Sequence, residues 1–267
     1  MARVKVNDIE LYYETHGTGE AIVFISGFSA DHTLWREVVD RFKKNYQVIL
    51  FDNRGVGRTD VPLGEYTITQ MAEDVAALCS HLDLAKANFI GNSMGGFILQ
   101  TLMHRYPHLI KTAVISNSAS TINSCYKIYL ASQLEFLKAN VPMEALVKAS
   151  CSWVYSYQFL AKEKVFNNLI QLALDNPYPF TIAGYHGQYA ALKGFNSEPW
   201  LKSIQIPTLV IGSDQDLIFR ESSIKALSEQ LPNATYYSFK ECGHLPPLEY
   251  PKKFYELVRG FLADNCK

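Results

Sequence analysis

The sequence predicts an α/β fold with a mostly parallel sheet that is covered by helices on both faces. Short apolar, β-branched runs recur along its 267 residues, and segments with helical periodicity separate them. The runs are apolar throughout, which is typical of parallel strands buried on both faces. Hydrophobic residues make up 48 % of the chain and charged residues 19 %, an ordinary balance for a globular protein with a sizeable core.

The alternation of strands and helices is clearest in the first half of the chain. Residues 1–17 alternate apolar and polar side chains, a pattern that indicates strands. The order predicted after them is strand 21–26, helix 34–44, strand 46–52, helix 68–84, strand 87–93, helix 94–106 and strand 112–118. Pro107 ends the third of these helices, because a proline does not continue a helix.

A long helical segment interrupts this alternation before it resumes. Residues 121–203 contain no convincing strand, and four stretches have helical periodicity: 126–139, 142–154, 162–174 and 178–192. The order then continues with strand 207–213, helix 221–231, strand 235–242 and helix 251–264. An insertion between two strands of a parallel sheet lies at their carboxyl ends, over the site. We therefore expect a core domain of residues 1–120 and 204–267 and a helical cap of residues 121–203.

Composition argues against several classes of protein. The net charge of −1 and the lack of a basic run argue against binding to nucleic acid or to an anionic membrane. No window of 18 apolar residues predicts a membrane span, and the start of the chain lacks the apolar stretch of a signal peptide. The odd number and wide spacing of the cysteines indicate reduced thiols in a cytoplasmic protein. The five cysteines are Cys79, Cys125, Cys151, Cys242 and Cys266.

Ser93 is the strongest candidate for a catalytic residue. It lies between Gly91 and Gly95, where a predicted strand gives way to a helix. A serine exposed at such a turn takes a strained backbone conformation, and larger flanking side chains would collide with the neighbouring strand and helix. The pattern G-x-S-x-G in this setting is typical of a nucleophile elbow. The alternative is a serine that only caps a closely packed helix.

A nucleophilic serine needs a base, and the base needs an acid that orients it. Elbow enzymes supply these in the order serine, acid, histidine. His244 is the candidate base, because it follows strand 235–242 in a loop shaped by Gly243 and two prolines. Asp214 and Asp216 both follow strand 207–213. We favour Asp216 because the acid must clear the end of the strand, and Asp214 stays the alternative.

Two N–H donors are expected to stabilise the oxyanion that forms during acyl transfer. One is the main-chain N–H of Met94, and the other is that of Phe28 in the loop after strand 21–26. The aromatic stretch 153–159 predicts a mostly apolar pocket beneath the cap. The expected pocket residues are Gly27, His32, Trp153, Tyr157 and Leu245.

No metal or cofactor is expected. His104 and His108 have the spacing of a zinc pair, but Pro107 interrupts the helix between them and no acidic ligand follows. Gly55 and Gly57 resemble the start of a dinucleotide fingerprint that lacks its third glycine.

Over nearly its whole length the chain resembles the α/β-hydrolase superfamily. The matching segments are SGFSADHTLW, FDNRGVGRTD, GNSMGGF, PTLVIGSDQD and GHLPPLEYP, followed by the helix PKKFYELVRGFL. The resemblance implies an α/β-hydrolase fold with an eight-stranded, mostly parallel sheet and a Ser-His-Asp triad, and it aligns the acid on Asp216. Ser26 replaces the histidine usual before the loop glycine, and Arg220 replaces a proline often found after the acid.

Within the superfamily the chain looks like the 3-oxoadipate enol-lactonase-like esterases. The similar segments are GEYTITQMAEDV, SNSAS, SWVYSYQFLAKE and YHGQYAALKGF. We expect a serine hydrolase, monomeric or homodimeric, that cleaves a small carboxylic ester or lactone without a cofactor. The cap contains no arginine to neutralise a substrate carboxylate, so a neutral substrate is favoured over the enol-lactone itself.

Two other functions remain open. A thioesterase or carrier-protein methyl esterase would need a cationic docking surface, whereas the lysines of the cap are interspersed with acidic residues. A hydrolase-fold receptor or signalling protein would bind a small ligand in the same site and turn it over slowly.

Overall fold

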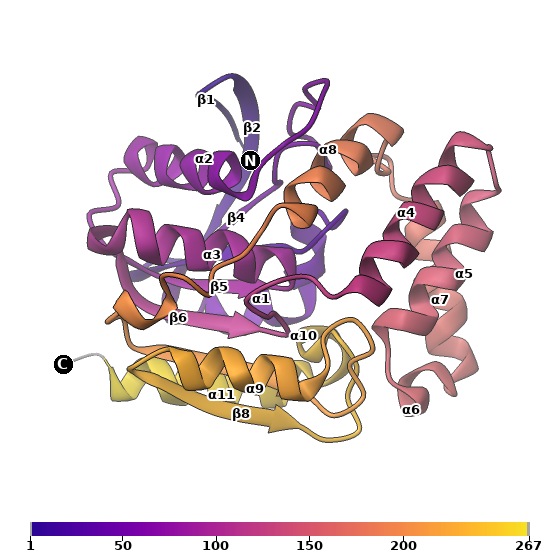
Figure 1. Ribbon diagram of the computed structural model, residues 1–267. Helices are drawn as coiled ribbons and strands as arrows, with labels where there is room; N and C mark the ends of the chain where they lie inside the picture. Colours follow the sequence, from indigo (N-terminus) through magenta and orange to yellow (C-terminus); the bar gives the residue numbers. More distant parts are fainter. Residues whose placement is uncertain (1, 266–267) are drawn as a thin grey trace.

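The computed structural model describes residues 2–265 and places eight strands in one sheet (Figure 1). Across the sheet the order is β1-β2-β4-β3-β5-β6-β7-β8. Strands β3 to β8 are parallel, and β2 is antiparallel to both of its neighbours. The prediction of a mostly parallel, eight-stranded sheet is confirmed. The strands are β1 (Ala2–Val6), β2 (Ile9–His16), β3 (Glu20–Ile25), β4 (Tyr46–Phe51), β5 (Ala87–Asn92), β6 (Ile110–Ser116), β7 (Thr208–Ser213) and β8 (Ala234–Phe239).

Helices bury both faces of this sheet, and for that reason its central strands are apolar throughout. Every residue of β5 and β7 is buried. The core on one face includes buried residues of α2 (Ile68–His81), α3 (Met94–Arg105) and α9 (Glu221–Gln230). The core on the other face includes residues of α1 (Arg36–Phe42) and α11 (Pro251–Asp264), among them Phe42 and Phe254.

The turn between β5 and α3 is a single residue, Ser93, with φ 55° and ψ −119°. Glycines on both sides make this turn possible. A methyl group at Gly91 would come within 2.6 Å of the carbonyl carbon of Gly95, and one at Gly95 within 2.8 Å of the carbonyl carbon of Ile25. Real side chains do not approach a backbone this closely, so α3 lies against β3 and β5 only because both positions are glycine.

The cap segment is helical, as expected, and leaves the sheet between β6 and β7. Its helices α4 to α7 lie beyond the carboxyl ends of the strands, toward which the arrowheads of β6 and β8 point (Figure 1). Among its residues the structure shows only one isolated β-bridge, between Thr121 and Asn196. The bounds of the cap as a separate domain stay a prediction. Its α-helices are α4 (Ser124–Lys138), α5 (Met143–Val154), α6 (Tyr157–Leu160), α7 (Glu163–Leu174) and α8 (Ile182–Lys193).

Several element bounds differ from those predicted. Helix α8 begins at Ile182 and not at residue 178, because Pro177 and Pro179 precede it and cannot donate to a helix. Strand β8 ends at Phe239, since the chain turns at Glu241 with φ 56°. A short helix that was not expected, α10 (Pro246–Glu249), follows with a proline in its first turn, a position that suits proline.

The expectations about membrane spans and cysteines can be compared with residues 2–265. No helix in residues 2–265 is both long enough and apolar enough to cross a membrane. Cys79, Cys125, Cys151 and Cys242 are free thiols, and Cys266 lies outside the described residues.

Gly95→Ala tests the close approach of α3 to β3. We expect it to lower the free energy of unfolding by about 2–3 kcal/mol, because the added methyl meets main-chain atoms that have no room to move. Urea denaturation gives the value. Gly260→Ala in α11 is the control: its methyl would meet nothing within 4 Å, so it should stabilise the protein by up to about 1 kcal/mol through helix propensity. Equal effects of the two changes would contradict this account.

Candidate active site

Ser93 lies at the carboxyl edge of the sheet and is almost enclosed, with 6 % of its surface exposed. Its main-chain N–H donates to the carbonyl of Ser116 at 2.9 Å, which ties the turn to the end of β6. On the other side it borders the loop after β3, because a methyl at Gly27 would lie 3.2 Å from the Cβ of Ser93. Gly27 therefore packs directly against Ser93, and a methyl group there would fit only if Ser93 shifted slightly.

His244 and Asp216 form a buried pair, with Nδ1 of the imidazole 2.8 Å from Oδ2 of the carboxylate. Only 3 % of His244 and 5 % of Asp216 is exposed. Oδ1 of the acid accepts from the N–H groups of Ile218 at 2.8 Å and Phe219 at 3.0 Å. Oδ2 also accepts from Nδ2 of Asn117 at 3.0 Å. With both oxygens engaged, the carboxylate has one orientation and holds the proton of His244 on Nδ1.

Asp214, the alternative acid, is exposed and lies away from this pair. Its Oδ1 accepts from the main-chain N–H of Cys242 at 3.3 Å, a contact that closes the turn. It has no hydrogen bond to His244 among the described residues. The geometry therefore favours Asp216 as the partner of the imidazole.

The loop that carries His244 lies beside the turn that carries Ser93. Nδ2 of Asn92, the residue before the serine, is 3.4 Å from the main-chain oxygen of His244 and 3.2 Å from that of Ser116. Nε2 of the imidazole is buried and has no hydrogen-bond partner within residues 2–265. A buried nitrogen with an available lone pair, held by a fixed carboxylate on a loop bonded to the residue before Ser93, has the properties of a general base.

The two expected oxyanion donors come from the two loops that meet at Ser93. Met94 is the first residue of α3, and Phe28 follows Gly27 in the loop after β3. No hydrogen bond from the N–H of either residue is found in the described part of the chain. Gln188 of α8 fixes the next residue of this loop: its Oε1 accepts from the N–H of Ser29 at 2.9 Å, and its Nε2 donates to the carbonyl of Arg54 at 2.8 Å.

A cavity of about 530 Å³ lies between the cap and the core. Phe28 lines it at the loop after β3, here called the oxyanion loop. Ile218 and Leu245 line it close to Asp216 and His244 in the chain. Neither Ser93 nor His244 is among the lining residues. Most of the wall is apolar or aromatic and comes from the cap. Cap residues of the wall include Tyr126, Tyr129, Leu137, Cys151, Trp153, Val154, Leu169, Leu172 and Phe180.

Of the five expected pocket residues, Trp153 and Leu245 line this cavity, and Gly27, His32 and Tyr157 do not. Tyr157 is 78 % exposed, because helix α6 turns its side chain to the surface. His32 is buried beneath the loop and bound to Asp52. Neither of these two side chains lines the cavity, and their contact with a substrate stays a prediction.

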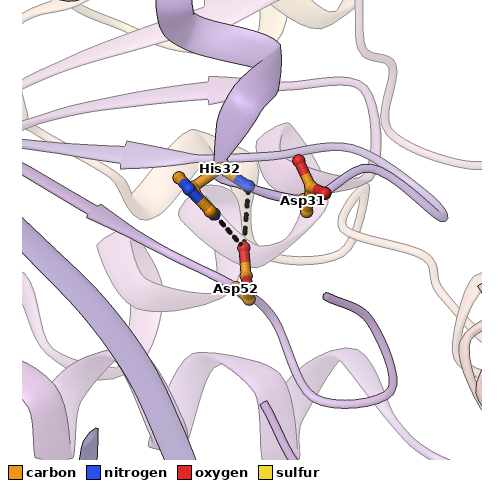
Figure 2. Close-up of side chains that lie close together, drawn as sticks. All are labelled: Asp31, His32 and Asp52. Atoms are coloured by element: carbon orange, nitrogen blue, oxygen red, sulfur yellow. Dashed lines mark hydrogen bonds and ion pairs between the residues drawn. The ribbon is translucent and has the colours of Figure 1, made fainter. Parts of the chain in front are cut away.

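His32, Asp52 and Asp31 lie close enough together to hold a metal ion, with ligand atoms within 4.8 Å of one another. Figure 2 shows that Oδ1 of Asp52 accepts from both the main-chain N–H and Nδ1 of His32, at 2.8 and 2.7 Å. Oδ2 of Asp52 accepts from the N–H of Arg58, whose guanidinium is 3.3 Å from Nε2 of His32. The atoms of Asp52 and His32 that would bind a metal already form hydrogen bonds within the fold, and the guanidinium of Arg58 faces them. The cluster therefore does not suit a metal ion.

Sequence analysis missed three polar residues that hold the site. Asn117, which follows β6, donates to Asp216. Gln188 binds the oxyanion loop at Ser29. Glu249 binds the loop that carries His244, here called the histidine loop. Only Asn117 carried a signal, because it follows a strand at the same sheet edge as Ser93.

Comparison with known proteins places the chain in a family. The model for the alpha/beta hydrolase fold matches residues 20–251, so the chain belongs to this family. A protein of Mycobacterium tuberculosis (strain ATCC 25618 / H37Rv) named as a candidate non-heme bromoperoxidase, BpoC, is 28 % identical over 96 % of this chain and 98 % of its own. The 3-oxoadipate enol-lactonase 2 of Acinetobacter baylyi is 28 % identical over 96 % of this chain and 94 % of its own.

A solved structure supports the same placement. The enol-lactonase from Burkholderia xenovorans LB400 superposes with a TM-score of 0.89 at 26 % identity, covering 98 % of this chain and all of that one. The fold and these relatives define a hydrolase-fold enzyme and support a hydrolytic activity.

A serine-directed fluorophosphonate tests the reactivity of Ser93. We expect one adduct per chain, located by mass spectrometry on the peptide with Ser93, because the neighbouring imidazole activates this hydroxyl alone. Ser93→Ala should abolish labelling. Ser118→Ala, at another buried serine near the same sheet edge, should retain it. An adduct on any other residue would refute the assignment.

Proposed function

We propose that this protein is a serine hydrolase that cleaves a carboxylic ester or lactone through Ser93, His244 and Asp216. The observation that carries the proposal is the buried His244–Asp216 pair, 2.8 Å apart, on a loop bonded to the turn that presents Ser93. The relatives named as enol-lactonases act on a lactone, which belongs to the same class of carbonyl compound.

The reaction begins when Nε2 of His244 takes the proton of Ser93 and Oγ attacks the carbonyl carbon. The carbonyl oxygen becomes an oxyanion that the N–H groups of Met94 and Phe28 stabilise. His244 then gives its proton to the leaving oxygen, and the acyl group stays on Ser93 as an ester. His244 takes a proton from water as the water oxygen attacks this ester. The bond between the acyl carbon and Oγ then breaks, His244 returns the proton to Oγ of Ser93, and the acid is released. Asp216 keeps the imidazole in the required tautomer throughout.

The cavity supports an apolar substrate larger than the small one expected from sequence. Its volume of about 530 Å³ lies in the range that holds drug-sized ligands, and its walls offer few polar groups. Each methylene buried there contributes about 0.8 kcal/mol. We infer that the acyl chain of the substrate lies beneath the cap.

Charges at the cavity favour a neutral substrate. Arg36, which sequence analysis did not consider, is a lining cation, but it is exposed, and Asp31 and Asp175 line the same cavity. The two carboxylates outnumber the guanidinium, so a substrate carboxylate would be poorly paired. The enol-lactone of 3-oxoadipate therefore ranks below a neutral ester, although two relatives carry the name enol-lactonase.

Asp216→Asn and Asp214→Asn, compared with each other, test the acid. We expect Asp216→Asn to lower kcat by about 10⁴, because an amide facing Nδ1 disfavours the tautomer that leaves Nε2 free to accept a proton. Asp214→Asn should retain kcat within about threefold, since Asp214 lies away from the imidazole. Hydrolysis of p-nitrophenyl butyrate measures both. A larger loss for Asp214→Asn would refute the triad.

A series of neutral p-nitrophenyl esters from acetate to decanoate tests the cavity. We expect kcat/KM to rise with chain length and then level off when the cavity is filled. Ala173→Trp, in the wall formed by α7, should move the optimum to shorter chains. Ala145→Trp, exposed on α5 and not part of the wall, is the control and should leave the profile unchanged. A flat profile, or faster cleavage of a carboxylate-bearing lactone than of every neutral ester, would contradict the proposed substrate class.

A further inference from the structure

Residues 154–157, here called the cap junction, connect α5 to α6 and lie directly on the loop that carries His244. The N–H of His244 donates to the carbonyl of Val154 at 2.6 Å. A methyl at Gly243 would come within 2.6 Å of both the nitrogen of Ser156 and the carbonyl oxygen of Val154. The cap junction and the histidine loop are thus in main-chain contact, which only a glycine at position 243 permits.

Glu249, at the end of α10, binds both segments at once. Its Oε1 accepts from the N–H of Gly243 at 3.0 Å and from the N–H of Ser156 at 3.2 Å. Its Oε2 accepts from the hydroxyl of Ser156. One side chain therefore joins the residue before His244 to the cap, across 93 positions of sequence.

The contacts of Glu249 use both of its carboxyl oxygens. Three donors converge on its two oxygens, and no salt bridge to it is found in residues 2–265. Glutamine has one acceptor oxygen for the two N–H groups, and its NH₂ group would face the Ser156 hydroxyl, which would have to become an acceptor. Burial raises the pKa of the Glu249 carboxyl, and the hydrogen bonds from Ser156 and Gly243 oppose that rise. The carboxyl group of Glu249 is thus costly to ionise, and its hydrogen-bond donors are two main-chain N–H groups and one hydroxyl. Within the described residues it forms no hydrogen bond to Asp216 or His244.

We propose that Glu249 is a positioning residue for the hydrolytic reaction: through Gly243 and Ser156 it holds His244 at the distance from Ser93 that proton transfer requires. The proposal rests on the function proposed above. Glu249 contacts neither the imidazole nor the cavity, and it acts through the main chain of the histidine loop. The position of the cap and the geometry of the base are coupled through this carboxylate.

Glu249→Gln tests the role. We expect kcat to fall by about 10²-fold, because a displacement of about 1 Å at the base costs that much, while KM stays within about twofold because the cavity wall is unchanged. A second readout is the low-field proton resonance of Nδ1–H of His244, which should shift or broaden in the variant. Glu256→Gln is the control: it removes an exposed carboxylate on the next helix, 3.9 Å from Lys252, and should change neither readout.

Ser156→Ala keeps the test informative if Glu249→Gln does not fold. It removes the donor to Oε2 but keeps the N–H of Ser156, so we expect a smaller loss of kcat, about threefold to tenfold, and the same movement of the His244 resonance. In the double variant the two losses should not add, since both act through one contact. Wild-type kcat and an unmoved resonance in a folded variant would overturn the proposal. Absence of ester hydrolysis in the wild type would instead refute the proposed function, and the resonance would still report the position of His244.

Discussion

The close approach of α3 to the sheet is the constraint on which the rest of the site depends. Because Gly91 and Gly95 carry no side chains, the helix begins one residue after β5 and lies against the carbonyl of Ile25. Ser93 then takes a conformation with positive φ that projects its side chain from the sheet edge. The same close packing brings the N–H of Met94, the first of α3, beside the loop after β3. The negative charge of an oxyanion would develop between these two segments. The proposed nucleophile and the proposed oxyanion donors thus depend on the same close packing of α3 against the sheet.

The parallel sheet brings the remaining groups to this point. The ends of β6 and β7 supply Asn117 and Asp216, and the loop after β8 supplies His244. The cap then contacts each of these loops from outside. Gln188 binds the oxyanion loop, the carbonyl of Val154 binds the histidine, and the N–H of Tyr157 donates to Gln215 beside the acid at 3.0 Å. The cap is therefore part of the scaffold of the site as well as the wall of its cavity.

Sequence was most informative where the physical constraint is local in the chain. The glycines around Ser93, the strand before His244 and the short turn before Asp216 each lie within a few residues of the group they position, and the structure brings His244 and Asp216 together as expected. Side-chain direction depends on packing that no local pattern describes, so sequence analysis did not predict that Tyr157 is exposed or that His32 is buried. Gln188 could not be found, because Ser29 lies 159 positions away. Glu249 binds Gly243 nearby in the chain, but its link to the cap is to Ser156, 93 positions away, and no local pattern shows it.

The two ends of the cap meet in a narrow stem. The N–H of Ser197 donates to the carbonyl of Ser120 at 3.0 Å, and Thr121 and Asn196 form an isolated bridge next to it. A chain excursion closed at its base resembles a hairpin loop, whose closure entropy grows only slowly with length. Caps of quite different size can therefore be grafted onto this stem with little thermodynamic cost to the sheet. If Glu249 positions His244 as proposed, a grafted cap must also bring a hydroxyl for Glu249 and an amide for Ser29, and these two contacts then define the exchangeable unit.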